Sequence, residues 1–143
     1  PTRQWRHGEA ARAALAVIPN EGSVAANTSL VPLLAQRRAL VRFPFTTGYL
    51  DRNGQAQDVD WIAVDLDLLE RYGIAFRGDW KQLRNSRRWI REHRGRYRPQ
   101  AINDGVVVLQ RNGPFDAKLE SKLNQQLQRS LSTSPHKGKA KNN

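Results

Sequence analysis

The side chains that suggest chemistry stand at the ends of two apolar segments. Asn27 and Thr28 follow the short stretch Ser23–Ala26, and Asp65 stands near the end of the longer stretch Val59–Leu66. In open α/β sheets, ligands favour the crevice outside the carboxyl ends of parallel strands, where the strand order reverses. Amide, hydroxyl and carboxylate groups can all hydrogen-bond to the hydroxyl groups of a ligand. We therefore predict a binding site for a hydroxylated ligand at Asn27, Thr28 and Asp65.

A purely structural interpretation of the same residues stays open. Asn27 is a residue type that caps its own turn, and Asp65 is placed to cap a short helix predicted over Asp67–Tyr72. In that case these polar groups would satisfy the backbone and would not be available to a ligand.

Motifs typical of enzymes are absent from the sequence. It contains no Gly-x-Gly-x-x-Gly, no phosphate-binding loop ending in Lys-Ser/Thr and no Gly-x-Ser-x-Gly. The absence of cysteine excludes disulfides, thiol catalysis and cysteine-ligated zinc. His7, His93 and His136 lack the spacing of metal ligands, so we interpret each as an exposed polar residue. We also interpret Asp51–Gln55 as a turn, not a calcium loop. No catalytic residue, metal or cofactor is expected in this chain.

The charge distribution suggests a second kind of site. The net charge is +11, and residues 77–143 carry sixteen basic and five acidic side chains, whereas residues 1–76 carry eight of each. An arginine-rich face with a tryptophan suits either a lipid–water interface or a nucleic acid backbone, and it can also be a solvated helix face. The predicted contact residues for an anionic surface are Arg84, Arg87, Arg88, Trp89, Arg91 and Arg94.

Short strands that alternate with helices must position these residues. This order predicts an α/β fold: a small three-layer, Rossmann-like sheet with three parallel strands, the first of them between the second and the third. The sequence Asn103-Asp104-Gly105 predicts a C-terminal antiparallel hairpin. The expected helices are Arg6–Ile18, Leu30–Arg37, Asp67–Tyr72 and Trp80–Arg94, and the expected strands are Ser23–Ala26, Ala39–Phe43, Val59–Leu66, Tyr97–Ile102 and Val106–Arg111, with Thr46–Asp58 as a loop.

We expect one α/β domain over residues 1–114, a frayed helix over residues 115–131 and a disordered basic tail over residues 132–143. The longest apolar run, Ala13–Ile18, has six residues, which is too short for a membrane span or a signal peptide. Because residue 1 is proline, we expect an excised domain or a processed product.

Several motifs together resemble one bacterial family. The sequence carries Ile18-Pro19-Asn20, an apolar Val-Ala-Ala strand, Leu30-Val31-Pro32-Leu33-Leu34, the strand Val59–Asp65 and the hairpin Asn103–Val106. Over Glu9–Asn112 it resembles the soluble C-terminal part of predicted multi-spanning membrane proteins catalogued as domain-of-unknown-function two-thousand-and-seventy-nine, including cyanobacterial members. Asn20 stands where that pattern usually has a second proline, and Leu33 where it usually has histidine.

The resemblance implies a membrane-anchored protein whose spanning helices are similar to those of GT-C type glycosyltransferases, which use lipid-phosphate sugars. In that class the catalytic acid lies in the membrane part, and the C-terminal domain faces the extracytoplasmic side. This chain would then be non-catalytic and would position or recognise a glycan or a lipid-linked acceptor. Its partners would be the transmembrane part of its own chain and anionic lipid head groups. The alternative is a small basic nucleic-acid-binding protein.

Overall fold

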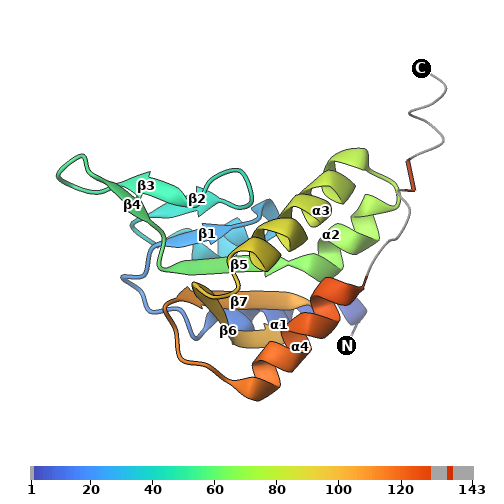
Figure 1. Cartoon of the computed structure of the whole chain (residues 1–143). Coiled ribbons are helices and arrows are strands. Elements are labelled where there is room, and N and C mark those ends of the chain that lie inside the picture. The colour runs from blue at the N-terminus through green and yellow to red at the C-terminus, as the bar shows by residue number, and fades with distance from the viewer. Residues whose placement is uncertain (1, 130–134, 137–143) are drawn as a thin grey trace.

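A five-stranded mixed sheet lies at the centre of the computed structural model, which describes residues 2–129 and 135–136 (Figure 1). A two-stranded hairpin projects from one end of this sheet. In chain order, the elements are α1 (Arg3–Leu15), β1 (Val24–Ala26), the 3₁₀ helix η1 (Thr28–Leu34), β2 (Leu40–Arg42), β3 (Gly48–Leu50), β4 (Ala56–Asp58), β5 (Trp61–Asp65), α2 (Leu66–Gly73), α3 (Arg77–Glu92), β6 (Tyr97–Asn103), β7 (Val106–Arg111) and α4 (Ala117–Gln128).

The strand order of the main sheet is β2-β1-β5-β7-β6. β1 pairs in parallel with both β2 and β5, so that Val24 lies opposite Leu40 on one side and Trp61 on the other. β6 and β7 form the antiparallel hairpin, and β7 also pairs antiparallel with β5. The predicted α/β fold, the order of the three parallel strands and the closing hairpin are therefore confirmed.

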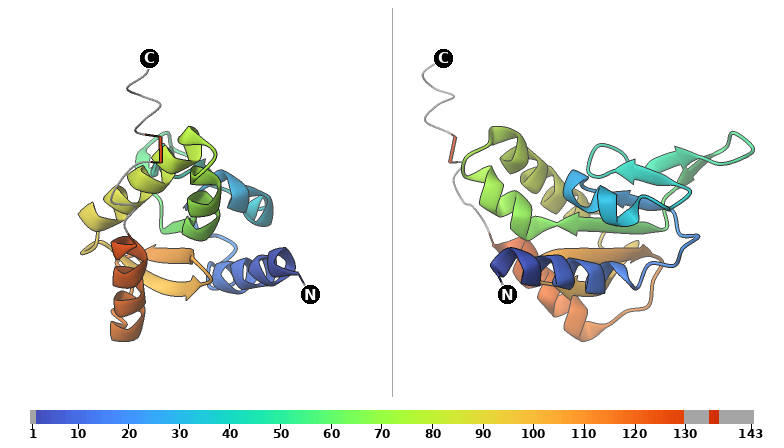
Figure 2. Two further views of the ribbon diagram at one scale, coloured as in Figure 1. Left: turned by 90° about the vertical axis from the view of Figure 1, so that its right-hand side faces the viewer. Right: turned by 180° about the vertical axis from the view of Figure 1, so that it is seen from behind.

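Helices cover both faces of the sheet, and the alternation of side chains along β5 shows how. Ile62 and Val64 belong to a core cluster with residues of α2, α3 and α4, whereas Trp61 and Ala63 belong to a second cluster with residues of α1 and η1. Because neighbouring side chains on a strand point to opposite faces, each face presents apolar side chains to its own helix layer. Figure 2 shows α1 and η1 together on the face opposite α2 and α3.

Two segments differ from the prediction. The expected loop Thr46–Asp58 contains the hairpin β3–β4 around the predicted turn, where the Asp51 carboxylate accepts hydrogen bonds from the backbone N–H groups of Asn53 and Gln55. Its three-residue strands are too short and polar for an alternation signal. The helix expected at Leu30–Arg37 is the 3₁₀ helix η1, which contains Pro32. Proline lacks the N–H of an α-helical hydrogen bond, and 3₁₀ geometry is common in such short segments.

The bounds of the last two helices, α3 and α4, differ from those predicted. α3 begins at Arg77 without a side-chain cap, so Asp79 lies in its first turn instead of capping it. In α4, which Asp116 caps, Leu123 and Leu127 are buried in the core cluster of the α2 and α3 face, so this helix packs on the sheet.

The predicted disordered tail, residues 132–143, lies outside the described residues except for Pro135 and His136. His136 is buried and its Nε2 lies 2.8 Å from the Gly73 carbonyl oxygen, so its predicted exposure was wrong.

Tyr97 allows a test of how β6 is anchored. Its buried hydroxyl donates a 2.7 Å hydrogen bond to the Val59 carbonyl, and burial raises the pKa of this phenol. Because the folded-state pKa exceeds the unfolded value, the stabilisation is present below about pH 10 and is lost as the pH rises through the folded-state pKa. We expect Tyr97→Phe to lower the free energy of unfolding by about 1–2 kcal/mol at neutral pH. Urea denaturation of the wild type and of Tyr97→Phe measures this difference in the free energy of unfolding.

The same variant serves as its own alkaline control, because Tyr49 and Tyr72 are present in both proteins. Between about pH 9 and 11, the wild type should lose more stability than Tyr97→Phe. Equal stability at neutral pH, together with the same alkaline loss, would show that the Tyr97 hydroxyl contributes nothing.

Candidate functional site

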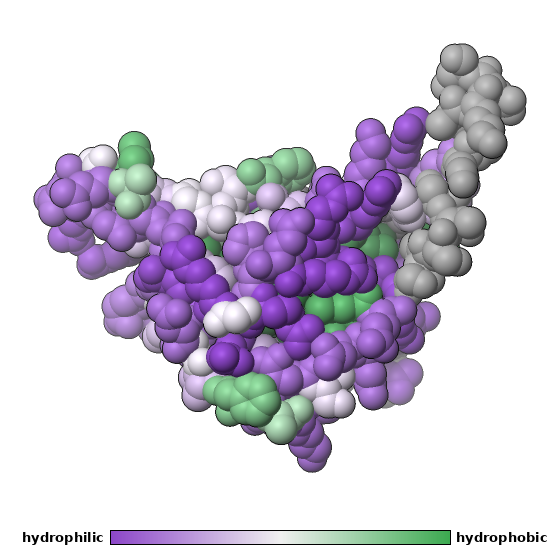
Figure 3. Space-filling view, in the orientation of Figure 1, coloured by the Kyte–Doolittle hydropathy of each residue, from purple (hydrophilic) through white to green (hydrophobic). Residues whose placement is uncertain are grey.

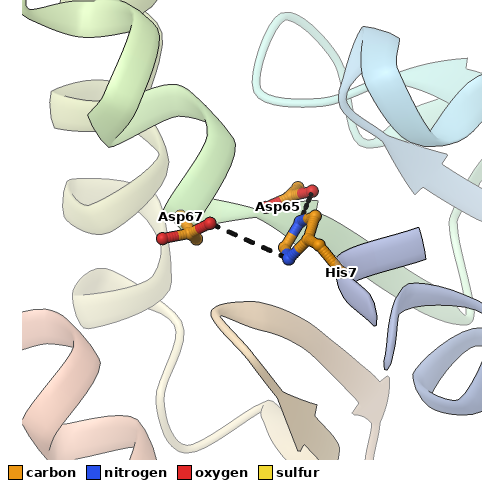
Figure 4. A group of neighbouring side chains, drawn as sticks. All are labelled: His7, Asp65 and Asp67. Carbon is orange, nitrogen blue, oxygen red and sulfur yellow. Dashed lines mark hydrogen bonds and ion pairs between the residues drawn. The ribbon is translucent and has the colours of Figure 1, made fainter. Parts of the chain in front are cut away.

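A buried histidine lies at the carboxyl end of β5, between carboxylates from different elements (Figure 4). His7 Nε2 is 2.6 Å from Asp65 Oδ2, and His7 Nδ1 is 2.7 Å from Asp104 Oδ2. Asp67 Oδ2 lies 3.8 Å from the same Nδ1. The sequence interpretation of His7 as an exposed polar residue was therefore wrong. We call these four residues the His7 cluster.

Helix α1 places His7 there because of helical spacing. His7, Ala11 and Ala14 are separated by four and three residues, and all three lie on the buried face of α1. α1 packs on β6 and β7, with its first turns at the edge of the sheet where β5 ends. Asp65 follows the alternation of β5, so its side chain points to the same face as Trp61 and Ala63, which is the face that α1 covers.

The hairpin turn between β6 and β7 brings Asp104 next to Asp67. Leu66 N donates a 2.9 Å hydrogen bond to the Gly105 carbonyl, which joins this turn to the start of α2. A Cβ at Gly105 would lie 2.5 Å from the Asp67 Cβ, and Gly105 has a φ of +81°. Only glycine fits both the space and the backbone conformation. The close approach sets the position of the Asp104 carboxylate beside His7.

Asp65 is fully bonded. Its Oδ1 accepts a 2.9 Å hydrogen bond from Leu68 N, which caps α2 as the structural interpretation predicted. Its backbone N–H donates a 2.9 Å hydrogen bond to Asn27 Oδ1, and Asn27 Nδ2 donates to Ser29 Oγ. Asn27 therefore joins β5 to the start of η1 and does not cap the helix with its side chain. The structure brings Asn27 and Asp65 together, and both are buried.

The electrostatics of the cluster favour a charged imidazole. Burial by itself would lower the pKa of His7, but the hydrogen bonds to Asp65 and Asp104 outweigh it, so the pKa of His7 is raised. With a proton on each nitrogen, the ring donates to both carboxylates. Asp67 has a different partner, because Arg71 Nη2 lies 3.0 Å from its Oδ2.

A pocket of about 390 Å³ opens at the carboxyl end of β1, between η1 and the helices α2 and α3. β1 is followed by η1 on one face of the sheet, whereas β5 is followed by α2 on the other, so the pocket lies where the connections diverge. We call it the switch-point pocket. Asn27 and Thr28 line it, as the sequence predicted for a site, whereas Asp65 lies beside Asn27 and does not line it. Its other lining residues are Ser29, Leu68, Leu69, Tyr72, Asp79 and Gln82.

Some arginines of α3 point to solvent, and others lie on the face of the helix that packs against the protein. Arg84, Arg88 and Arg91 are exposed, and hydrophilic side chains cover this face of the molecule in Figure 3. Arg87 is only 5% exposed and lies 3.9 Å from Glu70, and Arg94 forms a 2.6 Å ion pair with the Glu120 carboxylate. At 100° per residue, these two positions turn toward the packed face of α3.

The Trp89 side chain packs against other aromatic rings of the protein. Its ring stacks on His93 at 3.9 Å between centroids and meets the rings of Phe43 and Tyr97 edge-on. His93 is half-buried in this stack, so the interpretation of it as an exposed polar residue was wrong. Of the six predicted anionic-surface residues, Arg84, Arg88 and Arg91 are exposed, and the Arg91 guanidinium also donates a hydrogen bond to the Leu127 carbonyl of α4.

Substitution of Asp65 tests whether the His7 cluster holds this edge together. Asp65→Ala removes the α2 cap and leaves the buried His7 without one of its two carboxylates, so we expect a loss of about 3 kcal/mol in the free energy of unfolding. Asp104→Asn is the matched control, because the Asp104 side chain is 57% exposed and its loss should cost less than about 1 kcal/mol. Urea denaturation of both variants measures the two losses in the free energy of unfolding. Equal losses would contradict the conclusion that Asp65 holds this edge of the sheet together.

Comparison with known proteins bears on the kind of protein to which this chain belongs. Over the described parts of the chain, no helix combines the length and apolar composition needed to cross a bilayer. No curated protein and no solved structure matches the sequence. The sequence pattern of predicted membrane proteins known as DUF2079 matches residues 1–108. Because this match covers most of the sequence, the chain belongs to the DUF2079 family of predicted membrane proteins.

Proposed function

We propose that this chain is a non-catalytic, extracytoplasmic recognition domain of a membrane protein, and that it binds a glycan or a lipid-linked acceptor in the switch-point pocket. The observation that carries the proposal is the composition of this pocket. Hydroxyl, amide and carboxylate groups of Thr28, Gln82 and Asp79 line it beside the half-exposed ring of Tyr72. Sugars offer hydroxyl groups to such polar side chains and an apolar ring face to an aromatic side chain.

The non-catalytic part of the proposal rests on the state of Asp65, the acid that the sequence predicts in the site. Asp65 is buried and bonded on both oxygens, by His7 and by the Leu68 backbone. An acid held in this way serves the fold instead of moving a proton to a ligand. The resemblance to GT-C type glycosyltransferases, whose catalytic acid lies among the spanning helices, is consistent with a separate recognition role for this chain.

Saccharide binding to the purified chain tests the proposal. We expect glucose, galactose, mannose or N-acetylglucosamine, or short oligomers of these, to shift the amide NMR resonances of residues around the pocket. Gln82→Ala and Thr28→Val each remove one hydrogen-bonding group, so each should weaken binding by about tenfold.

Arg84→Gln is the control, because Arg84 is on the exposed side of α3 and does not line the pocket. Its affinity should equal that of the wild type. The proposal fails if none of these saccharides shifts the pocket resonances, or if the control weakens binding as much as Gln82→Ala does.

A second candidate function is contact with an anionic membrane surface, and one observation favours it. A hollow of about 560 Å³ lies beside α3, and its lining combines the cations Lys81 and Arg88 with Trp89 and with Phe45, which is 70% exposed. Cations next to an exposed aromatic ring suit the head-group region of a bilayer. Each basic residue near an anionic surface contributes about 1 kcal/mol.

Vesicle flotation separates this candidate from nucleic acid binding. At physiological salt, the chain should float with vesicles that contain anionic lipid, and Arg84→Gln combined with Arg88→Gln should reduce the bound fraction by about tenfold or more. DNA binding should be weak, sequence-independent and lost at higher salt. Tight DNA binding without vesicle binding would support the nucleic acid alternative, and no binding to either would leave α3 as a solvated face.

A further inference from the structure

We infer that the His7 cluster is a binding site for one divalent transition-metal ion, such as Zn²⁺, with His7 Nδ1, Asp67 and Asp104 as ligands and Asp65 as the residue that orients His7. This inference does not depend on the proposed glycan site. Its starting point is the convergence of chemically suitable atoms from three elements: α1, the start of α2 and the β6–β7 turn. Ligand atoms of His7, Asp65 and Asp67 lie within 4.8 Å of one another.

The two nitrogens of His7 have different surroundings. Nε2 faces Asp65, which is 2% exposed and fixed by its second hydrogen bond, to Leu68 N. Metal-binding histidines usually donate the N–H opposite the metal to a carboxylate of this kind, which fixes the tautomer and the ring orientation. Nε2 therefore keeps its hydrogen bond to Asp65 when an ion is bound, and Nδ1, which bonds to Asp104 in this structure, is the nitrogen that binds the ion.

Nδ1 faces two carboxylates at distances that one ion can bridge. Asp104 Oδ2 and Asp67 Oδ2 lie 2.7 Å and 3.8 Å from it. Zinc binds histidine nitrogen and carboxylate oxygen at about 2.0–2.2 Å, so ligand atoms around one tetrahedral ion are separated by about 3.3 Å. Small side-chain rotations bring both separations to this value, and the 57% exposed Asp104 side chain has room to make them once the ion replaces the proton on Nδ1.

The ion can reach this position from solvent. A hollow of about 290 Å³ adjoins the cluster and is lined by Asp67, Ile102, Asp104 and Gly105, by Lys122, Gln125 and Gln126 of α4, and by Arg129 just after it. Water in this hollow would complete the coordination. The other side of the cluster is closed by the buried Asp65.

The charges and ligand types favour a transition metal. Three carboxylates surround one imidazole, and within the described residues Asp67 also faces two arginines, Arg71 at 3.0 Å and Arg3 at 3.9 Å. A cation at Nδ1 replaces a single proton with two positive charges, which balances more of this negative charge. A nitrogen ligand disfavours Mg²⁺ and Ca²⁺, which prefer oxygen alone, whereas zinc and cobalt accept both.

Titration of the EDTA-treated, dialysed chain with Zn²⁺ and with Co²⁺ tests the inference. Calorimetry should show one equivalent of Zn²⁺, and saturation should raise the thermal midpoint, because the ion binds the folded state. Co²⁺ should give the visible absorption bands of a four- or five-coordinate ion with nitrogen and oxygen ligands. These readouts need no knowledge of the function of the protein.

Variants assign the ligands. Asp104→Asn should weaken Zn²⁺ binding by tenfold or more, and Asp65→Asn by about 10–100-fold because it disturbs the orientation of His7. His93→Gln is the matched control, since it removes a histidine outside the cluster, and it should leave the affinity unchanged. His7→Gln should abolish Zn²⁺ binding. If the His7→Gln variant does not fold, the affinity of Asp104→Asn for Zn²⁺ decides whether the cluster holds the ion.

The inference is overturned by either of two results. The first is the absence of Zn²⁺ and Co²⁺ binding at ion concentrations up to the millimolar range. The second is binding whose affinity is the same in the wild type and in Asp104→Asn, or binding that His93→Gln removes, because the ion would then be held elsewhere.

Discussion

The bonds made by Asp65 join the elements that meet at the carboxyl edge of the sheet. Its backbone N–H bonds to Asn27 after β1, one carboxylate oxygen caps α2, and the other bonds to His7 of α1. Removing a carboxylate from water is costly, and only a complete set of partners offsets that cost. The arrangement of two helices and two parallel strands at this edge therefore depends on one buried residue, through its backbone N–H and its carboxylate.

This arrangement gives the edge two sides with different chemistry. The switch-point pocket offers hydroxyl and amide groups, one carboxylate and an aromatic ring, whereas the His7 cluster offers three carboxylates and an imidazole. Asn27 belongs to the pocket and bonds to Asp65 of the cluster. Leu68 also lines the pocket, and its backbone N–H bonds to the Asp65 carboxylate, so two hydrogen bonds of Asp65 connect the two sites.

Much of the fold could be predicted from the sequence because its signals are local. The apolar stretch around Ile62 predicts a buried strand, Asn103-Asp104-Gly105 predicts a hairpin, and the handedness of crossovers then orders the parallel strands. Asn27 and Asp65 were found for the same reason, since each follows or ends a predicted strand. The β3–β4 hairpin was missed because its strands are short and polar.

The composition of the His7 cluster could not be predicted in the same way, because it depends on how α1 packs against distant elements. The spacing of His7, Ala11 and Ala14 does place the histidine on the small-residue face of α1, and this signal could have indicated burial. Likewise, the angular positions of Arg87 and Arg94 distinguish them from Arg84 and Arg88, whereas counting arginines along α3 does not. Which helix face is covered is a tertiary property, and spacing alone gives only the candidates.

The glycine at position 105 has a consequence for how this edge tolerates change. Contact between the β6–β7 turn and the start of α2 is made by main chain against main chain, with Leu66 N bonded to the Gly105 carbonyl. Side chains on both surfaces can therefore vary without altering the separation between the turn and the helix. A lengthened turn or a larger residue at position 105 would instead move the whole turn away, and Asp104 with it. The backbone contact at Gly105 thus sets the spacing of the carboxylates around His7, and substitutions of the neighbouring side chains should not change this spacing.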